Sequence, residues 1–144
     1  MSEFAKSQIA AEVSALRILV ADDSDAIRGI LRRLIADAAS ECRICGEAVD
    51  GRDLIQKVAE LRPDAVLLDL SIPVVSGLEA AKVLQRECPA VDVIFMSAQE
   101  PSVLSRLAAN AHVSASISKT LLAHELIPLL RDIWARKKAG REAA

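Results

Sequence analysis

The stretch "VLLDLSIPVVSG", residues 66–77, joins an apolar run to a single carboxylate and then to a loop. A strand buried on both faces of a sheet appears in a sequence as a continuous apolar run. A charge at the end of such a strand must be paired or functional, because an isolated buried charge is costly. Asp69 holds this position, and Pro73 and Gly77 follow it. The stretch therefore predicts a buried strand that presents Asp69 to a loop and a helix start.

Short apolar runs alternate with amphipathic stretches along the whole chain. In the first amphipathic stretch, residues 27, 30, 31, 34, 35 and 38 are apolar and follow helical spacing. Strands separated by helices are parallel, so five such units predict an α/β, doubly wound sandwich around one sheet. The predicted strands are 17–21, 43–49, 64–70, 91–98 and 114–118, and the predicted helices lie around 27–38, 54–61, 76–87, 101–110 and 123–138.

The composition narrows the class of protein. A chain of 144 residues is long enough for one domain with a substantial core, which we place at 15–138, between an N-terminal extension at 1–14 and a tail at 139–144. No apolar stretch is long enough for a membrane span, and the first residues lack the pattern of a secretory signal, so we expect a cytoplasmic protein. A net charge of −2 gives no basic footprint for nucleic acid.

Cys42 and Cys45 have the C-x-x-C spacing of some redox and metal sites. No second such pair and no histidine pair completes a zinc set. Residues i and i+3 of a strand point to opposite faces, and both cysteines fall in a predicted strand. We therefore expect these thiols, and Cys88, to be buried and structural.

The informative polar residues follow the predicted strands. Asp22 and Asp23 come after the first strand, Asp69 ends the third, Ser97 ends the fourth and Lys119 follows the fifth. The carboxyl ends of parallel strands share one edge, where ligands of such sheets bind. Two carboxylates about 4 Å apart repel by roughly 4 kcal/mol at an effective dielectric near 20, and a hard cation with oxygen ligands, such as Mg²⁺, removes that repulsion.

These residue types fit phosphoryl chemistry. With a cation held by its neighbours, one carboxylate can attack phosphorus as a nucleophile. An ammonium and a hydroxyl can hold the phosphoryl oxygens. These residue types are therefore chemically suited to the transfer of a phosphoryl group to a carboxylate.

Taken together, these motifs resemble the response-regulator receiver domains of bacterial two-component signalling, which include the chemotaxis regulators. The resemblance covers about residues 15–136 and implies a flavodoxin-like (βα)5 fold with strand order 2-1-3-4-5. Pro73 and Gly77 resemble the family's loop residues. The resemblance implies these site residues: Asp69 as phosphoacceptor, Asp22, Asp23, Asp69 and the backbone carbonyl of Ser71 as Mg²⁺ ligands, and Ser97 and Lys119 as contacts to the phosphoryl group.

The sequence departs from the family at three positions. The switch aromatic of the family lies three residues before the lysine, where this chain has Ser116. The glycine expected after the fourth helix is missing, and His112 lies in that turn. Thr120 follows the lysine in place of the frequent proline. Ser71 and Gln99 occupy variable positions that the resemblance links to dephosphorylation rate.

The resemblance implies a signalling domain that is not itself an enzyme. Its phosphoryl donor would be a histidine kinase or a phosphotransfer protein, and phosphorylation would alter the face formed by the fourth helix, fifth strand and last helix. The output would be a downstream protein partner, or a fused DNA-binding domain if the chain is a fragment. We expect no direct contact with nucleic acid or membrane, and a homodimer is possible.

Two alternatives remain open. The missing aromatic at Ser116 favours a non-switching interaction or dimerisation module with the same fold. An enzyme on a flavodoxin-like sheet is disfavoured, because a phosphatase would need a second acid or base two residues after the nucleophile, where Ser71 lies.

Overall fold

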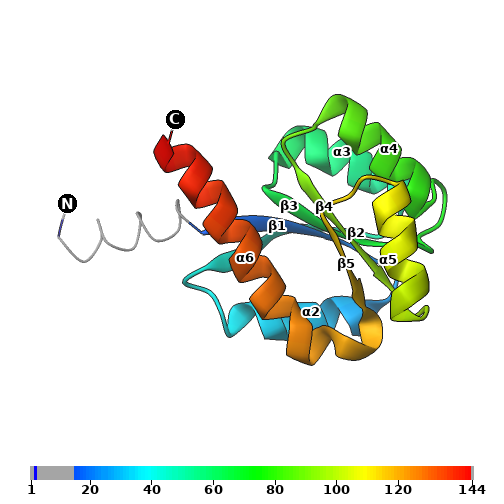
Figure 1. Ribbon diagram of the computed structural model, residues 1–144, viewed down its shortest axis with the longest axis horizontal. Coiled ribbons are helices and arrows are strands. Elements are labelled where there is room, and N and C mark those ends of the chain that lie inside the picture. The colour runs from blue at the N-terminus through cyan, green and yellow to red at the C-terminus, as the bar shows by residue number, and fades with distance from the viewer. Residues whose placement is uncertain (1, 3–14, 144) are drawn as a thin grey trace.

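The computed structural model describes residues 2 and 15–143, and its centre is a parallel sheet of five strands in the order β2-β1-β3-β4-β5 (Figure 1). The predicted fold class and strand order are confirmed. The strands are β1 (Leu16–Ala21), β2 (Cys42–Ala48), β3 (Ala65–Asp69), β4 (Asp92–Ser97) and β5 (Ala115–Ser118). The helices are α2 (Asp25–Ala36), α3 (Gly51–Leu61), α4 (Gly77–Glu87), α5 (Pro101–Asn110) and α6 (Leu122–Ala143), with a 3-10 turn η1 (Lys119–Leu121) before α6.

Helices cover both faces of the sheet (Figure 1). On one face α2 and α6 pack against alternate residues of the strands, with Leu31 and Leu126 at 0% exposure. On the other face α3, α4 and α5 pack against the remaining strand residues, and Phe95 lies fully buried there. The central strands are therefore apolar on both sides, which explains why their sequences are continuous apolar runs.

Side-chain caps begin three of the helices at the carboxyl edge of the sheet. The hydroxyl of Ser24 accepts a hydrogen bond from Ile27 N at 3.3 Å, and that of Ser76 accepts one from Glu79 N at 3.2 Å. The carboxylate of Asp50 accepts one from Asp53 N at 2.7 Å. Such caps satisfy amide groups that the first turn of a helix leaves free. They fix where α2, α3 and α4 start, next to the strand ends.

Several predicted boundaries differ from the structure. The last helix α6 continues to Ala143, so the residues from 139 to 143 of the predicted tail are helical. The predicted extension at 1–14 lies, apart from residue 2, outside the described residues. In α2, Ile30 is 47% exposed although it fits the apolar spacing, and the buried stripe is instead Arg28, Leu31 and Ile35. No described helix has the length and apolar character that crossing a membrane requires.

The cysteines are only partly as predicted. Cys42 is buried, but Cys45 and Cys88 are half-buried, and all three are free thiols. Cys45 is half-buried because the strand has a bulge there. Ile18 pairs with Ile44 and Leu19 pairs with Gly46, which leaves Cys45 out of the ladder. Burial raises the pKa of the Cys42 and Cys45 thiols. Both thiols are therefore held in their less reactive protonated form.

The turn after α5 takes the conformation that the missing glycine would favour. His112 has a φ of 56°, in the left-handed region, and its amide donates to Ala109 O at 3.2 Å. A side chain in this region costs of order 1 kcal/mol or more. The chain thus keeps the turn shape without the residue that adopts it most easily.

A hollow of about 870 Å³ lies at the amino edge of the sheet, opposite the predicted site. The turns before β3 and β4 and the last turns of α6 surround it, and Lys137 and Arg141 of α6 line it. Lys137 pairs with Asp92 at 3.1 Å and Arg141 pairs with Asp64 at 2.6 Å. These two ion pairs attach the end of α6 to the amino edge of the sheet, opposite the edge where Asp22 and Asp69 lie.

Candidate functional site

Strand register brings the predicted residues to one edge. Asp69 is the last residue of β3 and pairs with Met96 of β4. Ser97, the last residue of β4, pairs with Ser118, and Lys119 follows directly. Asp22 follows the last residue of β1. The strands therefore end together, and Asp22, Asp69, Ser97 and Lys119 lie at or directly after their ends, on one edge of the sheet.

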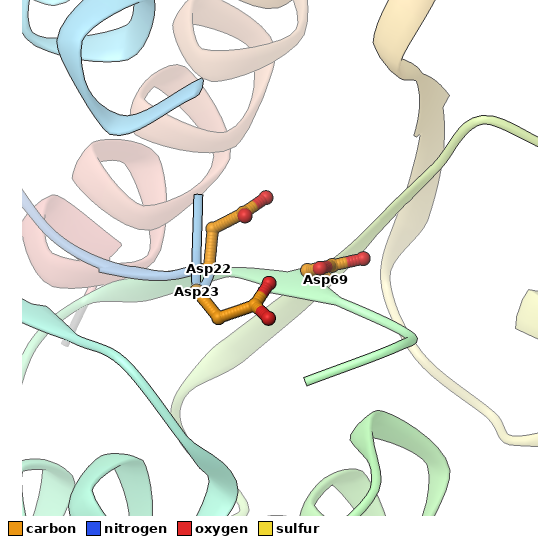
Figure 2. A group of neighbouring side chains, drawn as sticks. All are labelled: Asp22, Asp23 and Asp69. Carbon is orange, nitrogen blue, oxygen red and sulfur yellow. The ribbon is translucent and has the colours of Figure 1, made fainter. Parts of the chain in front are cut away.

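Three carboxylates gather at this edge. Asp22, Asp23 and Asp69 each offer an oxygen within 4.8 Å of the others. Figure 2 shows the three side chains next to one another, at the ends of β1 and β3. Asp22 is fully buried and Asp69 is 2% exposed, whereas Asp23 faces solvent. The cluster is thus a buried pair with one open side.

Lys119 is the cation of this cluster. Its Nζ lies 2.8 Å from Asp22 Oδ2 and 3.4 Å from Asp69 Oδ2. Burial by itself would lower the pKa of Lys119, but the hydrogen bond to Asp22 and the charges of Asp69 and Asp22 outweigh it, so the pKa is raised. The lysine therefore stays charged at neutral pH. One ammonium faces three carboxylates, which leaves the site with excess negative charge.

The backbone and side chain of Asp22 are fixed from several directions. Its amide donates to Ala48 O at 3.1 Å, and its Oδ1 accepts from Ser24 N at 2.9 Å. Its carbonyl accepts a hydrogen bond from the guanidinium of Arg28. Oδ2 is buried and, among the described residues, meets only the ammonium of Lys119. The hydrogen bond at Oδ1 and the ammonium beside Oδ2 together explain how a fully buried carboxylate is tolerated.

Asp69 is held at both oxygens. Ser71 donates to Oδ1 from its amide and from its hydroxyl, each at 3.2 Å, while Lys119 lies on the side of Oδ2. Ser97 is buried near the end of β4, and its hydroxyl accepts a hydrogen bond from Gln99 N at 3.1 Å. Ser71 and Lys119 therefore orient the carboxylate of Asp69, whereas no described hydrogen bond joins Ser97 to it.

Two glycines allow the loop after Asp69 to pack closely. A Cβ on Gly77 would lie 2.7 Å from Asp69 O, and one on Gly51 would lie 2.0 Å from Val75 O. Neither glycine has a positive φ. These positions therefore need glycine for close approach, and Val74 between them adopts a φ of 74°. The loop is held tightly against the strand that carries Asp69.

The acidic cluster fits a divalent cation. All three donors are carboxylate oxygens, the ligands that Mg²⁺ prefers. An ion with ligands at about 2.0–2.1 Å would need the outermost of these oxygens to draw slightly together. The excess negative charge and the sparsely paired Oδ2 of Asp22 favour that movement. Such an ion would neutralise charge on a transferring group.

The structure brings together most of the predicted site residues. Asp22, Asp23, Asp69 and Lys119 form one cluster. Ser71 contacts Asp69 through its amide and hydroxyl, and the ligand role of its carbonyl stays a prediction. Sequence reasoning did not identify Arg28. The signal in the sequence was its spacing. Arg28 lies three residues before Leu31 and seven before Ile35, which places a charged residue on the buried stripe of the helix.

Residues 18–131 match the response regulator receiver domain family. The chain belongs to this family. This receiver is 29% identical over 123 residues to the response regulator GacA of Pseudomonas viridiflava, which covers 85% of this chain and 57% of that protein. It is 42% identical over 83 residues to a protein-glutamate methylesterase/protein-glutamine glutaminase of Pyrococcus abyssi, which covers 58% of this chain and 22% of that protein.

A solved structure shows the same likeness. The response regulator domain of Thermotoga maritima CheB superposes with a TM-score of 0.74 at 26% identity, covering 84% of this chain and 97% of that chain. This receiver spans little more than half the length of GacA and about a fifth of the Pyrococcus enzyme. The enzymatic name of that relative therefore describes a protein most of which has no counterpart here.

Proposed function

We propose that this receiver accepts a phosphoryl group on Asp69 in a two-component system or phosphorelay. The observation that carries the proposal is the setting of Asp69, a buried carboxylate with Ser71 at one oxygen, Lys119 beside the other and an acidic pair next to it. We assign the cation ligands to Asp22, Asp23, Asp69 and the carbonyl of Ser71, and the ion to Mg²⁺. A bound ion would neutralise negative charge on the phosphoryl group during its transfer.

The chemistry of the chain's own residues follows from this setting. An oxygen of Asp69 forms a bond to phosphorus, and the bond from phosphorus to the donor breaks, with its electron pair leaving on the donor atom. Lys119 is placed to pair with a phosphoryl oxygen once the carboxylate is esterified. Ser97, at the end of the neighbouring strand, is proposed to donate its hydroxyl to another. Asp69 is modified in the step, and the receiver acts as a phosphoacceptor.

The partners follow from the same chemistry. The natural donor is a phosphohistidine on a kinase or a phosphotransfer protein. The output is a protein partner, or a further domain in the longer protein if this chain is part of one, as GacA is longer than the shared region. Placement in the cytoplasm is part of this proposal, since such donors and outputs act there.

The test is intact mass after incubation with acetyl phosphate and Mg²⁺. We expect a gain of one phosphoryl group in the wild type and in Asp132→Asn, whose carboxylate is exposed on α6. We expect no gain in Asp69→Asn and none with the metal chelated. Equal gain in the wild type and Asp69→Asn would overturn the proposal.

A second candidate, a non-switching interaction module, is favoured by Ser116. This residue pairs with Phe95 across β4 and β5, in the position where the family's switch aromatic would lie. Hydrogen exchange of α5, β5 and α6, with and without beryllofluoride as a phosphoryl mimic, separates the two. Changed protection on that face supports switching, and unchanged protection with the mimic bound supports the module.

A further inference from the structure

Arg28 is a buried arginine that the proposed chemistry does not use. Arg28 is 8% exposed and lies in the first turn of α2, on the face that packs against the sheet. Long charged side chains are almost never buried unless they are paired. The pairing of Arg28 therefore shows what holds it in this place.

The guanidinium contacts three elements at once. One terminal nitrogen donates to the carbonyl of Asp22 after β1, and the other contacts the carboxylate of Asp25 in α2. Its Nε lies 3.2 Å from Glu47 Oε1 near the end of β2. This fork joins β1, β2 and α2 at the residue that carries the innermost carboxylate of the acidic cluster.

Arg28 and Lys119 contact different atoms of Asp22 and therefore have different roles. The ammonium of Lys119 points at the carboxylates of Asp22 and Asp69 themselves. Arg28 instead binds the carbonyl of Asp22, and its charge is balanced by Asp25 and Glu47. It can therefore fix the main chain of Asp22 without occupying the carboxylate oxygens that a cation would take.

We propose that Arg28 is a positioning residue that holds Asp22 in place for a divalent cation, with its own charge neutralised by Asp25 and Glu47. The inference rests on the proposed function, because it takes Asp22 as a cation ligand. Removing a group that orients a metal ligand typically lowers the metal affinity about 10–100-fold. A bulky apolar residue would fill the space but could not hold the carbonyl.

The helix supplies a matched control. Arg32 lies one turn further along α2 and pairs with the same Glu47, with Nε 2.9 Å from Oε2. Its side chain is 53% exposed, and its described contacts do not include Asp22. Removing Arg32 therefore weakens the attachment of α2 to β2 while leaving Asp22 held.

The experiment measures binding of Mn²⁺, as a probe for Mg²⁺, from the electron paramagnetic resonance signal of the free ion. The full chain is compared as wild type, Arg28→Met, Arg28→Lys and Arg32→Met, each checked for folding by circular dichroism. We expect Arg28→Met to bind about tenfold or more weakly, Arg28→Lys to recover part of the affinity, and Arg32→Met to stay within about twofold of the wild type.

A second readout separates positioning from loss of structure. In phosphorylation by acetyl phosphate, the Mg²⁺ concentration for half-maximal rate is expected to rise about tenfold in Arg28→Met. The rate at saturating Mg²⁺ is expected to return to near the wild-type value. A folded Arg28 variant that binds Mn²⁺ as tightly as Arg32→Met would overturn the inference. A wild type that binds no Mn²⁺ would overturn the cation site itself, and the inference with it.

Discussion

Lys119 lies closer to Asp22 than to Asp69, with its Nζ 2.8 Å from an oxygen of the first and 3.4 Å from an oxygen of the second. The ammonium thus already neutralises part of the acidic cluster from within. A divalent cation that takes Asp22 as a ligand must share or displace this contact. Lys119 therefore competes for Asp22 with the metal that the proposed reaction needs.

This competition makes a prediction for Lys119→Met. We expect its affinity for Mg²⁺ to rise several-fold, since one unit of competing charge is removed, while phosphorylation of Asp69 slows because a contact to the phosphoryl group is lost. Mn²⁺ titration and intact mass measure the two effects. Lys137→Met is the control, because Lys137 has similar exposure and pairs with Asp92 instead. Weaker metal binding in Lys119→Met alone would contradict the competition.

Ser71 makes a prediction about the rate of phosphorylation. Its amide and its hydroxyl both stabilise Oδ1 of Asp69 in the unreacted state, and a hydrogen bond to a charged group is worth about 1.5–3 kcal/mol. In Ser71→Ala the hydroxyl is lost while the amide and carbonyl remain. We expect the initial rate with acetyl phosphate to rise about threefold, because the unreacted carboxylate loses a fraction of that stabilisation. Ser71→Thr keeps a hydroxyl and should match the wild type, and a slower Ser71→Ala would refute this reading of the contact.

Gly77 makes a prediction about stability. A methyl group there would lie 2.7 Å from the carbonyl oxygen of Asp69, so the loop would have to shift. We expect Gly77→Ala to lower the free energy of unfolding by about 1–3 kcal/mol, measured by urea denaturation. Gly140→Ala is the control, because nothing lies within 4 Å of the added group in α6. It should be neutral or stabilising by up to about 1 kcal/mol. Equal effects of the two changes would show that close packing at Gly77 is not the reason for its glycine.

The cysteines make a prediction about pH. Burial raises the pKa of Cys42 and Cys45 above the ordinary value of 9.0, and the thiolate is the form that reacts. Alkylation by iodoacetamide should therefore be slow at neutral pH and still rising at pH 9. Peptide mass spectrometry follows each residue, with a short unfolded cysteine peptide as the control. A rate that levels off below pH 9, or a disulfide between the two under mild oxidation, would contradict the structural role.

The alternation of apolar runs and helical stretches was enough to predict the fold, because the central strands β1, β3 and β4 are buried on both faces. The site was predictable for a related reason, since the residues after Ala21, Leu68, Met96 and Ser118 must meet once the strands are parallel. The roles of those residues came from resemblance, and the distances had to come from the structure. That Lys119 favours Asp22 over Asp69 depends on side-chain packing that no spacing encodes.

The failures have local physical causes. Ile30 fits the apolar spacing of α2 yet is exposed, because the buried stripe of the helix runs through Arg28, Leu31 and Ile35 and leaves Ile30 to one side. The bulge at Cys45 shifts the strand pairing by one residue, and its one sequence signal is Gly46 inside the strand, which sequence reasoning did not use. The end of α6 extends past residue 138 because Arg141 pairs with Asp64, far away in the sequence.

The central claim is that Asp69 itself receives the phosphoryl group, and one measurement tests it most directly. After incubation with acetyl phosphate and Mg²⁺, borohydride reduces an aspartyl phosphate to homoserine, and peptide mass spectrometry locates the converted residue. The account predicts homoserine at position 69, dependent on Mg²⁺, with Asp22 and Asp23 unchanged. Conversion at Asp22 or Asp23, or none at position 69 while the intact protein gains a phosphoryl group, would contradict it.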